Sequence, residues 1–119
     1  MEVHLVRHGE TDYNQQRRIQ GHAPAVLSEK GIDQSIEISN KIEIEKPAII
    51  LTSEMIRATQ TAKIIADYHH LEWQEIPELN ARDFGDIFGL SYIELKNNNP
   101  VLFDKLKSDR DIFVPPNGE

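Results

Sequence analysis

The alternation of strand-like apolar runs with helical segments is the feature that most constrains the fold of this chain. Residues 2–6, 48–52 and 73–76 read as three strands. Between them, residues 29–45 and 54–69 repeat apolar side chains at helical spacing. Strands that alternate with helices indicate an α/β fold, and we expect a three-layer sandwich with a largely parallel sheet.

Capping residues and apolar stripes predict where the helices begin and which faces they bury. Ser28 and Ser53 suit the N-cap positions of the first two helices. Residues 48–52 form an almost continuous apolar run, which is typical of a strand buried on both faces. Residues 91–96 and 101–107 predict two more helices, and residues 113–119 predict a loop. The inner faces of the first two helices are predicted to carry Ile32, Ile36, Ile38 and Ile42, and Met55, Ala58, Ala62, Ile65 and Ala66.

Composition excludes several classes of protein. The 119 residues suffice for one domain with a modest core, and we expect a single domain over residues 1–119. The formal net charge of −7 argues against a nucleic-acid partner, which needs a basic face. The chain has no cysteine, no apolar run of about 20 residues and no signal-peptide pattern. We therefore expect a cytoplasmic location and no membrane partner.

Arg7, His8 and Gly9 follow the first predicted strand, and Arg57 lies just beyond the second. Ligands of parallel sheets bind beyond the carboxyl ends of the strands, so both segments should open on one edge. Guanidinium groups match phosphate oxygens, and a neutral imidazole can attack phosphorus. Asn14 could add a neutral hydrogen bond. Taken alone, Arg-His-Gly is more typical of a surface turn, so the rest of the pattern must support this interpretation.

Several further motifs agree with a phosphoryl-transfer site. In order and spacing they resemble the histidine phosphatase superfamily, specifically its phosphoglycerate mutase-like branch, and the resemblance covers nearly the whole chain. The motifs that carry it are LVRHGET at residues 5–11, RIQG at 18–21, LSEKG at 27–31, RATQTA at 57–62 and DFG at 83–85.

The resemblance implies a role for each matching residue. His8 is similar to the nucleophile that becomes phosphohistidine, and Arg7 and Arg57 are similar to the arginines that clamp the phosphate. Asn14, Gln20 and Gly21 resemble the loop that borders the substrate. The implied substrate is a small phosphomonoester, with inorganic phosphate as a further ligand, and the resemblance implies no metal and no cofactor.

Two departures from the family pattern limit these expectations. The family places a general-acid glutamate where this chain has Ala81, and such a group is typically worth about 10²–10⁴ in rate. Asp83 or Glu78 could substitute, although neighbouring positions of an extended segment point in different directions. We therefore expect impaired activity. It should be weak on alkyl phosphates, whose poor leaving groups need a proton, and less reduced on aryl phosphates, whose leaving groups are good.

The second departure is length. The resemblance implies a second histidine on a later His-Gly turn, and His22, His69 and His70 do not occupy that context. We therefore expect the C-terminal half of the fold to be missing, which would leave apolar edges exposed. A homo-oligomer or a complementary segment would cover them.

Two other interpretations stay open at this point. The chain could be a catalytically inactive phosphate-binding or interaction module. It could also be a structural α/β fragment in which Arg57 pairs with acidic residues of its own helix, since charged helix residues are usually solvated.

Overall fold

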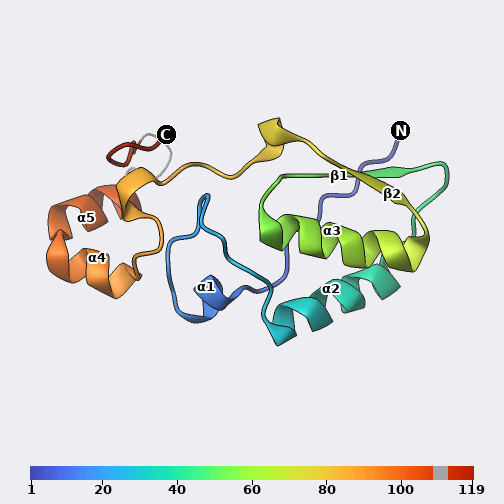
Figure 1. The fold of residues 1–119 in the computed structure, drawn as a ribbon, viewed down its shortest axis with the longest axis horizontal. Helices are drawn as coiled ribbons and strands as arrows, with labels where there is room; N and C mark the ends of the chain where they lie inside the picture. Colours follow the sequence, from blue (N-terminus) through green and yellow to red (C-terminus); the bar gives the residue numbers. More distant parts are fainter. Residues whose placement is uncertain (109–112) are drawn as a thin grey trace. The chain divides into compact units, whose positions relative to one another are not determined.

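The computed structural model describes residues 1–108 and 113–119, which form two compact units. Unit 1 consists of residues 1–12 and 25–80, and unit 2 consists of residues 13–24 and 81–119. A short helix, α1 (Asp12–Gln15), lies where the chain first leaves unit 1 (Figure 1). Each unit has its own elements and its own buried side chains, so each is described by itself.

Unit 1 is an α/β unit with a parallel sheet. Strands β1 (Ile49–Thr52) and β2 (Glu72–Glu75) pair in parallel, with Ile49 opposite Glu72. Helix α3 (Ile56–His69) connects the strands and contacts both of them as well as helix α2 (Glu29–Lys41) (Figure 1). A 3₁₀ turn, η1 (Pro77–Leu79), follows β2. The predicted α/β class and the parallel pairing of the second and third strands are confirmed.

The predicted strand at residues 2–6 is wrong for the residues that the structure describes. The described sheet has two strands, β1 and β2, and residues 2–6 belong to no ladder. Val3 and Leu5 are 66% and 94% exposed. Their apolar pattern predicts a segment suited to a sheet, but a strand also needs a hydrogen-bonded neighbour. No described segment takes that position beside residues 2–6.

Helix α2 begins where the sequence predicts but buries a different face. Ser28 caps it, because its side chain accepts a hydrogen bond from the N–H of Gly31. The predicted stripe is wrong: Ile32 and Ile36 are exposed, and the buried positions are Gly31, Ser35 and Ser39. Small residues let neighbouring backbone approach the helix, and both serine hydroxyls donate to carbonyls four residues earlier.

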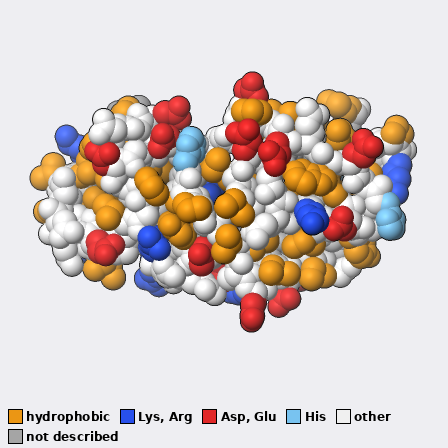
Figure 2. Space-filling view, viewed as in Figure 1, with side chains coloured by type: hydrophobic (Ala, Val, Ile, Leu, Met, Phe, Trp, Pro, Cys, Tyr) orange, Lys and Arg blue, Asp and Glu red, His pale blue; other side chains and the backbone are white. Residues whose placement is uncertain are grey.

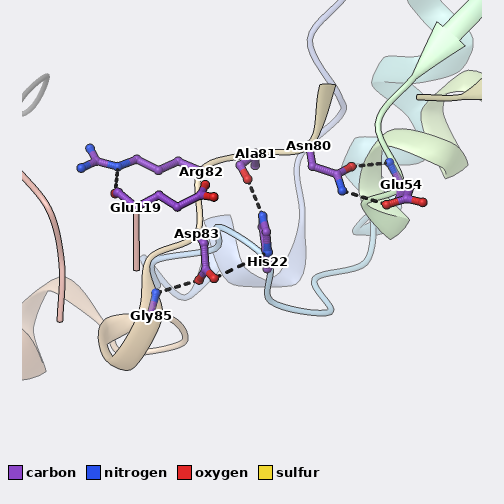
Figure 3. A network of polar contacts seen from close by, with 8 residues as sticks. All are labelled: His22, Glu54, Asn80, Ala81, Arg82, Asp83, Gly85 and Glu119. Atoms are coloured by element: carbon purple, nitrogen blue, oxygen red, sulfur yellow. Dashed lines mark hydrogen bonds and ion pairs between the residues drawn. The ribbon is translucent and has the colours of Figure 1, made fainter. Parts of the chain in front are cut away.

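The end of α2 and the start of α3 also differ from prediction. Ile42 is extended, so α2 ends at Lys41 rather than at residue 45. Helix α3 begins at Ile56 with Met55 as its N-cap, and no side chain caps it, so the predicted cap at Ser53 is wrong. Asn80 instead fixes the residues just before α3. Its Oδ1 accepts from the N–H of Glu54, and its Nδ2 donates to the Glu54 carboxylate (Figure 3).

Helix α3 buries most of the side chains that its sequence predicts. Ala62, Ile65 and Ala66 are buried, as expected, and Arg57 and Thr61 are buried with them. Strand β1 departs from prediction, because Ile49 and Leu51 are each 54% exposed and only the opposite face is covered. The continuous apolar run therefore does not mark a strand buried on both faces among the described residues. Figure 2 shows hydrophobic side chains at the surface.

Unit 2 is built from short helices around an apolar cluster. Its elements are the 3₁₀ turn η2 (Gly85–Ile87), helix α4 (Tyr92–Asn98) and helix α5 (Pro100–Ser108). The two predicted helices and the loop at residues 113–119 are confirmed. The helices of the described part of the chain are all too short or too polar to cross a membrane. The cluster consists of Ile19, Ile87, Leu95, Leu106 and Phe113, with Phe84, Leu90, Leu102 and Phe103 packed against it.

Candidate functional site

Gly9 is held in place by contacts with α2 and α3, and it anchors residues 7–9 of unit 1. Its N–H donates to Oγ1 of Thr61 on α3, at 3.2 Å. Its Cα lies against α2, since a Cβ at Gly9 would come within 2.2 Å of the Gly31 carbonyl oxygen. A Cβ at Gly31 would in turn come within 1.9 Å of the Glu10 carbonyl oxygen. Glycine at both positions therefore lets the turn and the first turn of α2 meet through their backbones.

His8 is held by the same glycine. Its Nδ1 lies 2.7 Å from the carbonyl oxygen of Gly9. A carbonyl can only accept, so Nδ1 carries the hydrogen and donates it. In the neutral ring, Nε2 then keeps its lone pair. This hydrogen bond selects the tautomer whose nucleophilic atom is Nε2.

Burial and two arginines lower the pKa of His8. Burial of the partly exposed ring is the largest cause that lowers the pKa of His8, and the positive charges of Arg57 and Arg7 lower it further. The hydrogen bond to Gly9 partly opposes this, since it raises the pKa. The net effect is a His8 pKa below its usual value, so more of the side chain is in its nucleophilic form near neutral pH.

Arg57 lies in the first turn of α3 and is only 5% exposed. Burial lowers the pKa of its guanidinium, which nevertheless stays protonated in proteins. Arg7 is exposed. The positive charges of both arginines lower the pKa of His8, and the predicted role of Arg7, His8 and Arg57 as one phosphate site stays a prediction.

Polar side chains of α2 and α3 hold the chain at Glu10 and at Leu27. Gln34 on α2 accepts from the N–H of Glu10, and Gln60 on α3 accepts from the N–H of Leu27. Ser28 donates to the Glu10 carboxylate at 2.9 Å. The chain after His8 is therefore fixed to α2 and α3 by hydrogen bonds as well as by packing.

The loop residues predicted to border the substrate belong to unit 2. The carbonyl of Asn14 accepts from the N–H of Arg17, and the carbonyl of Gln20 accepts from the N–H of Ala23. Gly21 is buried with a φ of +51°, a left-handed conformation that favours glycine. A Cβ there would lie 2.8 Å from the Arg82 carbonyl oxygen, so the turn packs closely against residues 82–84.

The position of Ala81 also lies in unit 2, beside two titratable side chains (Figure 3). Nε2 of His22 donates to the carbonyl of Ala81, and Nδ1 of His22 lies 4.0 Å from a carboxylate oxygen of Asp83. The other Asp83 oxygen accepts from the N–H of Gly85 at 2.8 Å. Asp83 thus serves as an acceptor within its own turn, and its role as a substitute acid stays a prediction.

Two residues of these clusters carry contacts that sequence reasoning did not assign. Thr61 stands four residues after Arg57, and this helical spacing was the only signal that could have pointed to it. His22 has no comparable signal, because its partner Ala81 lies 59 residues away in the sequence.

Two of the remaining histidines, His4 and His69, have contacts of a structural kind. Nε2 of His69 on α3 is 2.8 Å from the Ser39 carbonyl of α2, and Nε2 of His4 is 3.1 Å from a carboxylate oxygen of Glu2. In the part of the chain that the structure describes, no three His, Asp or Glu residues are grouped so that they could hold a metal ion.

Comparisons with known proteins identify the family of this chain. The histidine phosphatase superfamily (branch 1) matches residues 3–119. Phosphoglycerate mutase-like protein 4 of Arabidopsis thaliana is 36% identical over 99% of this chain and 53% of its own length. The adenosylcobalamin/alpha-ribazole phosphatase of Escherichia coli K12 is 33% identical over the whole chain and 59% of its own length.

A solved structure shares the fold as well. YhfR of Bacillus stearothermophilus superposes with a TM-score of 0.86 at 31% identity, over 95% of this chain and 56% of its own. The chain thus spans a little over half the length of these relatives. The phosphoglycerate mutase-like α/β fold is confirmed, and the chain belongs to branch 1 of the histidine phosphatase superfamily.

Proposed function

We propose that the protein carrying this chain transfers the phosphoryl group of a small phosphomonoester through a phosphohistidine at His8. The observation that carries this proposal is the hydrogen bond from His8 Nδ1 to the Gly9 carbonyl, which leaves the Nε2 lone pair free. The lowered pKa of His8 supports it, since a protonated imidazole has no lone pair with which to attack. The relatives named above include a phosphatase, which agrees with a phosphate-bearing substrate.

The first step makes one bond and breaks another. The lone pair of His8 Nε2 bonds to phosphorus, while the bond from phosphorus to the ester oxygen breaks and that oxygen leaves with the electron pair. Arg57 and Arg7 offset the negative charge on the phosphoryl oxygens. Asn14, Gln20 and Gly21 border the substrate in this proposal.

The second step regenerates the imidazole. Water attacks phosphorus, the phosphorus–nitrogen bond breaks, and its electrons return to Nε2 while the water proton passes to solvent or to a base. Transfer to a second hydroxyl would give a mutase, and we favour water, hence a phosphatase. Residues 1–119 act as a single domain in this proposal.

Ala81 favours a second candidate function, an inactive module that binds phosphate or a partner without turnover. An alanine cannot deliver a proton to the leaving oxygen, so an alkyl ester would leave slowly. An acid could still come from Asp83, which is only partly buried. The two functions differ in whether a covalent intermediate forms.

Intact-mass measurement after mixing with an aryl phosphate separates them. We expect a phosphoryl adduct in the natural protein and none in a His8→Ala variant, because the aryloxide leaves without a proton. An alkyl phosphate should form the adduct about 10²–10⁴ times more slowly. Thermal stabilisation by phosphate with no adduct from either ester would instead support the inactive module.

A further inference from the structure

We propose that Thr61 is a positioning residue, which sets the distance between the nucleophilic turn at His8 and the helix that carries Arg57. This inference rests on the proposed function, because it assigns a role within the same site. Thr61 touches neither reacting atoms nor substrate in this role. It acts through Gly9, whose peptide group holds the imidazole.

The hydroxyl of Thr61 has two hydrogen bonds, and they point to different parts of the site. Oγ1 donates to the Arg57 carbonyl at 2.9 Å and accepts from the N–H of Gly9 at 3.2 Å. One hydroxyl has one hydrogen to donate and lone pairs to accept with, so both bonds can form together. Thr61 therefore links the backbone beside Arg57 directly to the backbone beside His8.

Burial makes this link rigid. Thr61 is 5% exposed, Gly9 is buried, and the bond between them is buried. Water cannot readily replace the hydroxyl as the acceptor for the Gly9 N–H, and an unmet buried donor is unfavourable. The turn would move to find another acceptor if the hydroxyl were lost.

Movement of Gly9 would change the orientation of the imidazole, because one hydrogen bond joins the two. The carbonyl of Gly9 accepts from His8 Nδ1, so its orientation sets both the tautomer and the direction of Nε2. Gly31 blocks Gly9 on the α2 side, where even a Cβ would overlap. Gly9 is therefore held between Gly31 on α2 and Thr61 on α3. Of these two residues, Thr61 is the one on the helix that carries Arg57.

A matched pair of substitutions on α3 tests this role. Thr61→Val removes the hydroxyl and keeps the shape. Thr59→Val makes the same chemical change two residues away, where the hydroxyl donates only to the Ile56 carbonyl among the bonds described. We expect Thr61→Val to lower the maximum rate of His8 phosphorylation by an aryl phosphate about 10- to 100-fold. Thr59→Val should stay within about twofold, and Thr61→Ser should restore the rate.

The half-saturating substrate concentration provides a readout that general loss of stability would not give. It should change less than the maximum rate in Thr61→Val, because Arg57 and Arg7 remain in place. If Thr61→Val does not fold, Thr61→Cys keeps the volume with a weaker acceptor and should show a smaller loss of rate. Equal loss in the Thr61 and Thr59 variants, or no rescue by serine, would overturn the proposal.

Hydrogen exchange at the Gly9 amide tests the link without any reaction. It should accelerate in Thr61→Val and remain unchanged in Thr59→Val and Thr61→Ser. If the natural protein forms no adduct but Gly9 follows this pattern, the proposed function fails while the structural link stands. If the Gly9 amide exchanges equally in all variants, the positioning role itself is excluded.

Discussion

The two units of the molecule bury different kinds of side chain. In unit 1 the buried positions are mostly small or polar, such as Ala62, Ser35, Ser39 and Thr61, while large apolar side chains such as Leu51 lie half exposed. In unit 2 the buried cluster consists of large aliphatic and aromatic side chains. Hydrogen bonds and close backbone contacts order unit 1, whereas apolar burial orders unit 2.

This difference suits the chemistry assigned to unit 1. Small side chains and glycines allow residues 8–10 to approach α2 and α3 closely, and backbone N–H groups of Gly9 and Glu10 donate to side-chain oxygens of these helices. A large apolar core at the same place would keep the turn further away. The consequence is that unit 1 should tolerate loss of its half-exposed large side chains, such as Leu51, and be sensitive to loss of single polar groups.

The largest expected effect is a contrast between Ile87→Ala and Leu51→Ala. Ile87 is 3% exposed within the unit 2 cluster, so its truncation should lower local stability by about 2–5 kcal/mol. Leu51 is half exposed, and its truncation should change stability by about 0.5 kcal/mol. Hydrogen exchange at Leu95 in α4 and Ile65 in α3 reports each unit separately.

Equal losses of stability in Ile87→Ala and Leu51→Ala would contradict the difference in burial between the two units. A large effect of Leu51→Ala at Ile65 would mean that another surface covers β1 in solution. A homo-oligomer or a complementary segment, both expected from sequence, would produce that result, and light scattering at the same concentration would identify self-association.

Local rules explain which parts of this fold could be predicted from sequence. The Ser28 cap and the two helices of unit 2 depend on nearby residues and on simple periodicity, and the alternation of strands with helices predicts the parallel pair. The buried face of α2 does not, because it depends on the approach of Gly9, 22 residues before Gly31. The isoleucine stripe therefore predicted a helix correctly and its buried side wrongly.

The candidate site also has features that the sequence predicts and features that it does not. Residue type and order predict that Arg7, His8 and Arg57 form one phosphate site, and this stays a prediction; the charges of both arginines lower the pKa of His8. The carbonyl that selects the His8 tautomer and the Thr61 hydroxyl are connected through backbone groups, which leave no side-chain pattern. Such contacts become visible only when the backbone path is known.

A smaller effect is expected from the two serine caps. Ser91→Ala in unit 2 should cost about 1 kcal/mol, because the Ser91 N–H still donates to the Glu94 carboxylate after the hydroxyl is lost. Ser28→Ala in unit 1 should cost nearer about 2 kcal/mol, since its hydroxyl also donates to the Glu10 carboxylate. Urea unfolding monitored by circular dichroism measures both, and a larger loss for Ser91→Ala would contradict the greater polar dependence of unit 1.

The smallest expected effect is that of pH, which should act through His8 in unit 1. Burial and the charges of Arg57 and Arg7 lower the pKa of folded His8, while the bond to Gly9 limits the change. As pH falls through the ordinary histidine value of about 6.5, the unfolded chain binds a proton at His8 before the folded chain does. Stability therefore falls with falling pH in that window, and His8 contributes no such change above it.

Substitutions of His8 and Arg57 test whether His8 causes this loss of stability at low pH. A His8→Gln variant should lose less stability than the natural protein between pH 7.5 and pH 5, measured by urea unfolding at each pH. In an Arg57→Gln variant, stability should fall over a narrower range of pH. One of the two cations that lower the pKa of folded His8 is gone, so this pKa lies closer to that of the unfolded chain. If the natural protein and His8→Gln lose stability in parallel, the acid sensitivity comes from other groups. Burial and the charges of Arg57 and Arg7 would then not lower the pKa of His8 enough to favour its nucleophilic form.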